Sequence, residues 1–212
     1  MKFINISIIV SICVTTSITI KVATGFSLFG DNRPQFAADM ARRFEDAGAD
    51  ALTFHPRIAP DRRSRPPKWD VIQLVRQAVS IPVFGNGNLF EANDGIQMLR
   101  QTSCHGLSVG RMAVARPWLF AQWTDNRSFG DDIFYTTAAR LSQILTDHYD
   151  DHFSVKLFKK FSPYFCANFK FGHQILKRLM TAQTMNDIRN SLDAIFESIP
   201  EVLKRPNMNL FS

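Results

Sequence analysis

Apolar positions follow two alternating patterns along the first half of the chain. Short runs of β-branched and aromatic residues predict strands at 17–22, 51–54, 81–84 and 107–109. Between them, apolar residues recur every three or four positions and predict helices at 34–47, 69–79 and 91–102. Strands that alternate with helices favour parallel βαβ units with right-handed crossovers. The pattern therefore predicts an α/β fold with four successive βα units.

Individual helices also have a predicted buried face. In the first helix, Phe36, Met40 and Phe44 recur at helical spacing. In the third helix, Ala92, Ile96 and Leu99 lie on one face, and we expect that face to pack against the sheet.

The second half of the chain has a purely helical pattern from residue 133 to residue 199. It predicts helices at 140–152, 155–171, 172–180 and 184–198. Thr184 is a predicted N-cap, with Asp187 three residues later. We therefore expect two domains, a partial (β/α) barrel over residues 1–125 and a small all-helical domain over 126–212.

Composition and charge narrow the class of protein. With 212 residues, 45% of them hydrophobic, the chain can form a sizeable core, but a complete eight-stranded barrel needs about 250 residues. A net charge of +6 favours polyanionic partners such as nucleic acid. The cysteines at 13, 104 and 166 are odd in number and widely spaced. That spacing argues against a disulfide framework or a zinc site and is typical of a cytoplasmic protein.

The first residues allow two interpretations. A basic start followed by the apolar residues 4–14 resembles a secretory leader, but polar residues interrupt it and no cleavage site precedes Lys21. The run is also too short and mixed to cross a bilayer. We favour a buried strand over 16–22, with the leader, and hence a secreted protein, as the alternative.

Two strands end in glycine one βα unit apart, at residues 81–88 (IPVFGNGN) and 106–111 (GLSVGR). Glycine lets backbone N–H groups come close to a phosphate, and Arg111 adds a fork of donors. In a (β/α) barrel the last two strand–helix loops often hold phosphate. Together with Arg111, the two glycine-ended strands favour a phosphate site. Taken singly, either strand end would be an ordinary turn.

Two further polar residues end the earlier strands. Lys21 can pair with a cofactor carbonyl or hydroxyl, and His55 can donate to a phosphate or a carbonyl. Taken singly, Lys21 is equally well explained as a surface lysine, and His55 as a packed histidine.

The helical half interleaves basic and aromatic residues between 156 and 178. Lysines such as Lys159 and Lys160 can contact phosphates while aromatic rings stack on unpaired bases. The alternative is a helix whose aromatic side chains form the core and whose lysines cover the wet face.

In order and spacing, these segments resemble the C-terminal half of the tRNA-dihydrouridine synthase barrel. The matching stretches are 18–22 (ITIKV), 48–57 (GADALTFHPR), 68–70 (KWD), 79–83 (VSIPV), 85–87 (GNG), 110–111 (GR) and 117–120 (PWLF). The segment after residue 133 is similar to the family's tRNA-binding helical domain.

The resemblance implies a flavin enzyme. In that family NADPH reduces FMN, the reduced flavin delivers a hydride to C6 of a uridine in tRNA, and a cysteine protonates C5. The implied cofactor contacts are Lys21, His55, Asn86, Gly87, Asn88, Gly110 and Arg111. The implied RNA contacts are Arg57, Arg62, Arg63, Arg65, Lys159 and Lys160. No metal is expected.

The chain departs from the family pattern at three places. Pro56 separates His55 from Arg57 where the family has glycine, and Asn88 stands where it has an acid. The family's catalytic cysteine lies upstream of the strand at 18–22, and no residue here corresponds to it. We therefore expect a truncated synthase without its own proton donor. Such a chain would fold poorly alone or pair with a complementary N-terminal half-barrel.

Two alternatives remain for the function of this chain. One is a different FMN-barrel oxidoreductase, against which the helical tail and residues 117–120 count. The other is a non-catalytic RNA-binding remnant that uses its basic helices.

Overall fold

The computed structural model describes residues 19–23, 34–56 and 66–210, which divide into two compact units. The first unit ends at Gly110 and the second begins at Arg111. The sequence predicted a later boundary, between residues 125 and 126. The boundary comes earlier because α4 (Arg111–Ala115) packs against α7 (Asp151–Cys166). The alternative leader at the start of the chain lies outside the described residues.

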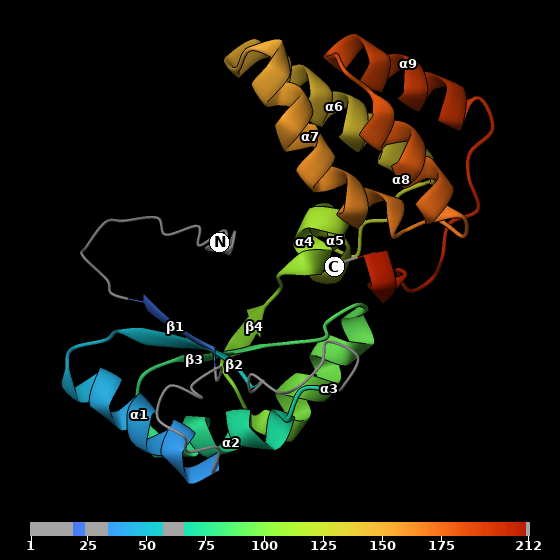
Figure 1. The fold of residues 1–212 in the computed structure, drawn as a ribbon. Helices are drawn as coiled ribbons and strands as arrows, with labels where there is room; N and C mark the ends of the chain where they lie inside the picture. Colours follow the sequence, from blue (N-terminus) through green and yellow to red (C-terminus); the bar gives the residue numbers. More distant parts are fainter. Residues whose placement is uncertain (1–18, 24–33, 57–65, 211–212) are drawn as a thin grey trace. The chain divides into compact units, whose positions relative to one another are not determined.

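The first unit is a parallel sheet in which every strand is followed along the chain by a helix. Its elements are β1 (Thr19–Ala23), α1 (Pro34–Asp46), β2 (Ala51–His55), α2 (Trp69–Ala78), β3 (Val83–Asn86), α3 (Ala92–Thr102) and β4 (Gly106–Ser108). The strand order in the sheet is β1-β2-β3-β4, with parallel pairing throughout (Figure 1). This confirms the predicted α/β class with four strands. β3 begins and ends two residues later than predicted, so Gly85 and Asn86 are strand residues.

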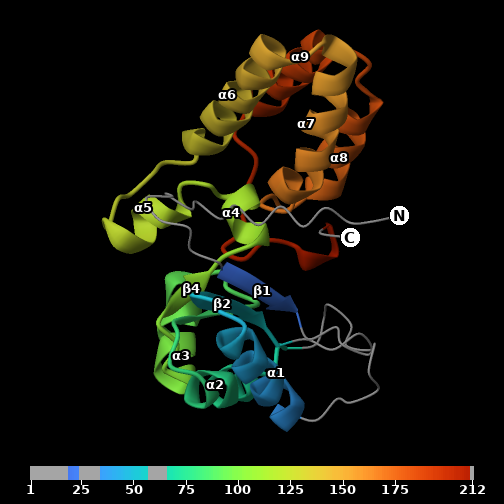
Figure 2. The ribbon, with the colours of Figure 1, turned by 90° about the vertical axis from the view of Figure 1, so that its left-hand side faces the viewer.

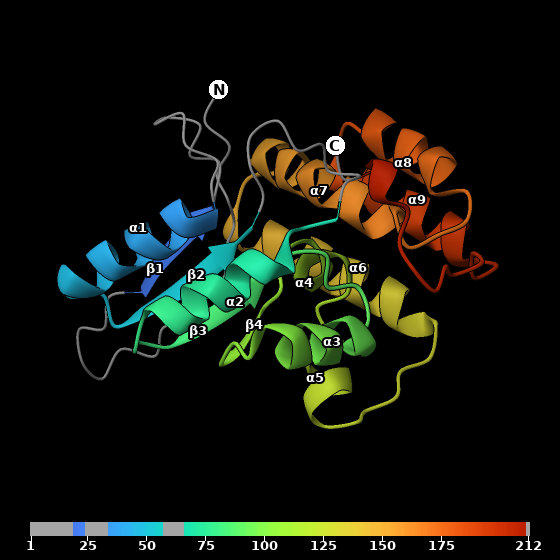
Figure 3. The ribbon, with the colours of Figure 1, turned by 90° about the horizontal axis from the view of Figure 1, so that it is seen from below.

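The three helices of this unit cover one face of the sheet. Figures 1 and 2 show α1, α2 and α3 together on one side, and the view from below in Figure 3 shows α1 and α2 crossing in front of the strands. On β2, Leu52 and Phe54 are 0% and 1% exposed, while Ala51, Thr53 and His55 are half-buried. This alternation follows from the two-residue period of a strand, and it assigns Leu52 and Phe54 to the helix side.

α3 packs through a different face from the one predicted. Ile96 and Leu99 are 45% and 38% exposed, whereas Gly95 and Met98 are buried. A Cβ at residue 95 would come within 2.6 Å of Leu107 Cδ1. The helix therefore approaches β4 through its glycine, and this close approach turns the predicted apolar face toward solvent.

The second unit is all-helical in its described residues. Besides α4 and α7 it contains α5 (Leu119–Thr124), α6 (Asp132–His148), α8 (Gly172–Thr181), α9 (Met185–Phe196) and the short 3-10 helix η2 (Met208–Leu210). Figures 1 and 2 show α6 to α9 packed side by side. α6 begins earlier than predicted, whereas the predicted cap of α9 is confirmed, since Thr184 Oγ1 accepts from Asp187 N at 3.1 Å. No helix in the described part of the chain combines the length and apolarity needed to cross a bilayer.

Buried aromatic rings form the core of this unit. Phe158, Phe165 and Phe169 are 0%, 1% and 1% exposed. Phe165 and Phe169 meet edge to face with ring centroids 5.2 Å apart, a favoured aromatic geometry. The structure therefore supports the alternative in which these aromatic side chains form a core, and they are not available for stacking on bases.

A buried asparagine connects three segments of the second unit. Asn168 is 0% exposed, and its Nδ2 donates to the carbonyls of Ala115 and Phe165, both at 3.0 Å. Its Oδ1 accepts from Arg116 Nε at 2.7 Å, and Arg116 Nη2 donates to Leu203 O at 2.6 Å. The side chains of Asn168 and Arg116 together link α4, the end of α7 and the C-terminal segment.

We expect Asn168→Ala to lower the free energy of unfolding by about 3 kcal/mol, because it removes the side chain that bonds the buried carbonyl of Ala115 and Nε of Arg116. Urea denaturation followed by circular dichroism measures this change. Asn190→Ala, on the exposed surface of α9, serves as the control and should stay within about 0.5 kcal/mol of the parent. Equal effects of the two substitutions would contradict the proposed link.

Candidate functional site

The carboxyl ends of β2, β3 and β4 bring three polar residues into one row. Phe54 pairs with Gly85, and Asn86 pairs with Ser108. His55 follows Phe54 directly, so His55, Asn86 and Ser108 are successive neighbours across the sheet. Because side chains alternate along a strand and Phe54 faces the helices, this row lies on the opposite face. In α/β folds ligands bind at this edge of the sheet.

Asn86 joins the ends of two strands. It is 9% exposed, and its Nδ2 donates to Ser108 O at 2.7 Å and approaches Ser108 Oγ at 3.2 Å. In the structure, the side-chain amide N–H₂ of Asn86 holds β4 against β3. The predicted cofactor contact of Asn86 stays a prediction.

Two side chains reach the backbone of the turn that follows β3. His55 Nδ1 lies 3.3 Å from Asn86 O and donates to it when that nitrogen carries the proton. Trp69, the first residue of α2, donates from Nε1 to Gly87 O at 3.3 Å. Two consecutive carbonyl groups are therefore held by side chains from two other elements.

This arrangement determines where the amides of the turn point. In a planar trans peptide, the N–H of the next residue points away from the carbonyl. With the carbonyls of Asn86 and Gly87 held by His55 and Trp69, the N–H groups of Gly87 and Asn88 point away from those two rings. Their φ angles of 129° and 51° are both positive. Successive backbone N–H groups of a turn are a known arrangement for binding an anion.

Only glycine suits position 87. A Cβ there would lie 3.2 Å from His55 Nδ1 and 3.2 Å from Pro67 Cβ, and a φ of 129° is rarely adopted by other residues. A side chain at position 87 would therefore force His55 or Pro67 to shift by a few tenths of an ångström.

Lys21 lies on the same sheet face as this row, but it does not end its strand as predicted, because β1 continues to Ala23 and Lys21 is its middle residue. It pairs with Thr53, two residues before His55 on the neighbouring strand. Lys21 is exposed, yet partial burial lowers the pKa of its ammonium below the ordinary value. A cation on this face favours an anionic ligand at the strand ends.

The other predicted phosphate residues fall at the boundary between the units. Gly110 is the last residue of the first unit, and Arg111 is the first residue of α4 in the second. A Cβ at Gly110 would have no heavy atom within 4 Å. Joint action of Gly110 and Arg111 with the turn after β3 stays a prediction.

The predicted RNA contacts lie in two regions. Arg57, Arg62, Arg63 and Arg65 fall outside the described residues. Lys159 and Lys160 lie on α7, where Lys160 is exposed and Lys159 is half-buried.

Neither described cysteine is placed as a proton donor at the strand ends. Cys104 precedes β4, at the opposite edge of the sheet, and its Sγ donates to Gly106 O at 3.2 Å. Cys166 is 0% exposed in the core of the second unit, and burial raises the pKa of its thiol well above the ordinary value.

Trp69 and Ser108 belong to this candidate site, and the sequence pattern does not single out either as a functional residue. In the sequence, Trp69 begins the predicted helix 69–79 and lies in the stretch 68–70 of the family resemblance. Its position just after a strand–helix loop was a usable signal, because such loops line the carboxyl edge of the sheet. Ser108 carried no signal, since its contribution depends on the register between β3 and β4.

Comparison with known proteins identifies one family. A family model described as "Dihydrouridine synthase (Dus)" matches residues 7–200. The chain is 27% identical over 194 residues to the "Probable tRNA-dihydrouridine synthase" of Mycobacterium leprae, covering 88% of this chain and 50% of that protein. It is 30% identical over 161 residues to the "tRNA-dihydrouridine synthase B" of Pseudomonas syringae pv. tomato, covering 73% and 47%. The chain thus spans about half the length of the curated relatives it matches.

Similarity to solved structures is weaker. "Morphinone reductase" matches with a TM-score of 0.40 and 20% identity, covering 53% of this chain and 30% of that chain. "The crystal structure of Mandelate oxidase" matches with a TM-score of 0.31 and 13% identity over 85% of this chain and 64% of that chain.

Binding of inorganic phosphate to the turn after β3 can be tested directly. We expect the amide signals of Gly87 and Asn88 to shift when phosphate is titrated into the full chain in an NMR experiment. Trp69→Phe removes the bond to Gly87 O and should raise the apparent Kd about fivefold, the effect of losing about one hydrogen bond. Trp123→Phe, in α5, is the matched control and should leave the Kd unchanged. An unaltered Kd in Trp69→Phe would contradict the orienting role of this indole.

Proposed function

The chain belongs to the dihydrouridine synthase family, and we propose that it takes part in the FMN-dependent reduction of uridine to 5,6-dihydrouridine in tRNA. The observation that carries this proposal is the turn after β3. The sequence Gly85-Asn86-Gly87, at the end of β3 and the start of this turn, matches the family's phosphate-binding motif. The carbonyls of Asn86 and Gly87 are held so that the next amides point away from the His55 and Trp69 rings.

The residues at the strand ends fit the phosphate end of FMN. The N–H groups of Gly87 and Asn88 would bind phosphate oxygens, and Lys21 would supply a positive charge on the same face of the sheet. His55 and Trp69 would hold the turn in the binding conformation. When bound, FMN supplies hydride transfer, with NADPH as the proposed reductant.

Further βα units would complete the barrel. Within the described sheet, β1 and β4 each pair with a single neighbour. Edge strands of this kind present unpaired backbone groups to another strand. We infer that a complementary half-barrel pairs with them, and that it brings the cysteine that protonates the uridine ring.

The helical unit would contact tRNA in the cytoplasm. Lys159 and Lys160 lie together on α7, in a chain with a net charge of +6. Their positive charges would bind phosphate groups of the tRNA backbone. The buried aromatic core beneath them would keep this basic surface rigid.

A role in RNA binding without catalysis is the second candidate function for this chain. The burial of Cys104 and Cys166 favours it.

Binding of FMN separates these two candidates. We expect the full chain to quench FMN fluorescence on titration, and Lys21→Met to raise the Kd about tenfold through loss of a charge-assisted contact. Lys177→Met, an exposed lysine of α8, is the control for the loss of one charge and should leave the Kd unchanged. Absence of FMN binding together with retained tRNA binding would favour the non-catalytic function.

Binding of tRNA is tested through its salt dependence. The double substitution Lys159→Ala with Lys160→Ala should weaken binding and reduce the slope of log K against log salt by about 1 to 2, because each lost phosphate contact lowers the slope by about 0.9. Lys204→Ala, an exposed lysine of the C-terminal segment, is the control. An unchanged slope in the double variant would remove these lysines from the interface.

A further inference from the structure

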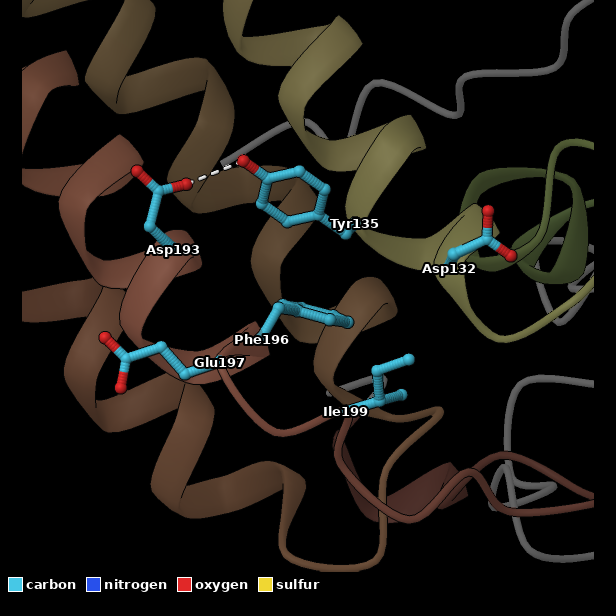
Figure 4. Close-up of a pocket in the computed structure, with 6 residues that line it drawn as sticks. All are labelled: Asp132, Tyr135, Asp193, Phe196, Glu197 and Ile199. Carbon is cyan, nitrogen blue, oxygen red and sulfur yellow. Dashed lines mark hydrogen bonds between the residues drawn. The ribbon is translucent and has the colours of Figure 1, made fainter.

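The second unit contains a hollow that the proposed function does not use. It lies between the start of α6 and the end of α9 and has a volume of about 420 Å³. Six residues line it, namely Asp132, Tyr135, Asp193, Phe196, Glu197 and Ile199 (Figure 4). This volume lies within the range of pockets that hold small organic ligands.

The floor of the hollow is apolar and held by the core. The rings of Tyr135 and Phe196 lie 5.6 Å apart, centroid to centroid. Phe196 also packs against Phe165 and Phe169, with centroids 6.1 and 5.8 Å away. Ile199 is 53% exposed beside them. The hollow therefore offers a ligand two packed aromatic rings, with the more exposed Ile199 beside them.

The rim of the hollow carries three carboxylates, and none of the six lining residues is basic. In Figure 4, Asp132 lies on one side of the apolar side chains, while Asp193 and Glu197 lie on the other. Tyr135 Oη donates to Asp193 Oδ1 at 2.7 Å and holds that carboxylate in place. In a chain with a net charge of +6, this is a local acidic surface that repels phosphate.

We propose that this hollow binds a linear aliphatic polyamine. Its methylene groups would lie on Phe196 and Ile199, and its ammonium groups would reach the carboxylates on the two sides. The faces of Tyr135 and Phe196 add cation–π attraction for an ammonium group.

The geometry favours this class of ligand over other cations. A metal ion needs oxygen ligands that converge on one point, whereas these carboxylates lie on opposite sides of an apolar floor. A single arginine or lysine side chain carries one charge and would satisfy one side. A polyamine carries separated charges joined by apolar segments, which matches separated carboxylates joined by an apolar floor.

Spermidine is the probe for the experiment, titrated into the full chain and followed by isothermal calorimetry and by NMR signals of α6 and α9. We expect saturable binding with shifts at Tyr135 and Ile199. Glu197→Gln should weaken binding about fivefold, the upper range for an exposed ion pair. Ile199→Ser should also weaken it, through loss of apolar contact.

Asp147→Asn is the matched control, because Asp147 is an exposed acid of α6 outside the hollow. It should bind spermidine as the parent does. Glu197 and Ile199 are exposed and lie beyond the last residue of α9, so both variants should keep the parent melting temperature. Two outcomes would show a diffuse counterion effect and overturn the proposal. In the first, Asp147→Asn weakens spermidine binding as much as Glu197→Gln does. In the second, Ile199→Ser leaves binding unchanged and Mg²⁺ displaces the spermidine. Lack of saturable binding would overturn it as well.

Discussion

The register of three parallel strands is the constraint on which the candidate site depends. Pairing of Asn86 with Ser108 and of Phe54 with Gly85 brings His55, Asn86 and Ser108 into one row at the carboxyl edge. A slip of one residue would turn this row toward the helices and expose Phe54, which is 1% exposed. Burial of the apolar face therefore also determines the position of the polar face.

The same constraint explains how the turn after β3 is held. Trp69 begins α2, and α2 packs on the sheet through buried residues such as Ile72 and Val75. Packing of this helix places the indole N–H of Trp69 within hydrogen-bonding distance of the carbonyl of Gly87. The orientation of two backbone amides thus depends on apolar contacts made elsewhere in the unit.

Much of the first unit was predictable from periodicity, because alternating strand and helix patterns are strong signals. The N-terminal end of α9, which Thr184 caps, was predictable as well, since a capping box is a local interaction. The buried face of α3 was not, because Gly95 contributes no hydrophobicity and acts by allowing close approach to Leu107. Asn86 was correctly placed at the edge of the sheet, but the partner of its side chain depends on β4.

The sequence by itself determined the order of the elements, the position of His55 at a strand end, and the family to which the chain belongs, because these follow from local patterns and motif spacing. Only the tertiary structure decided that Trp69 holds Gly87, that Asn168 and Arg116 link three segments, and that three carboxylates surround an apolar hollow. Each of these depends on residues far apart in the chain. Their distances are set by packing between elements, and no local pattern records such packing.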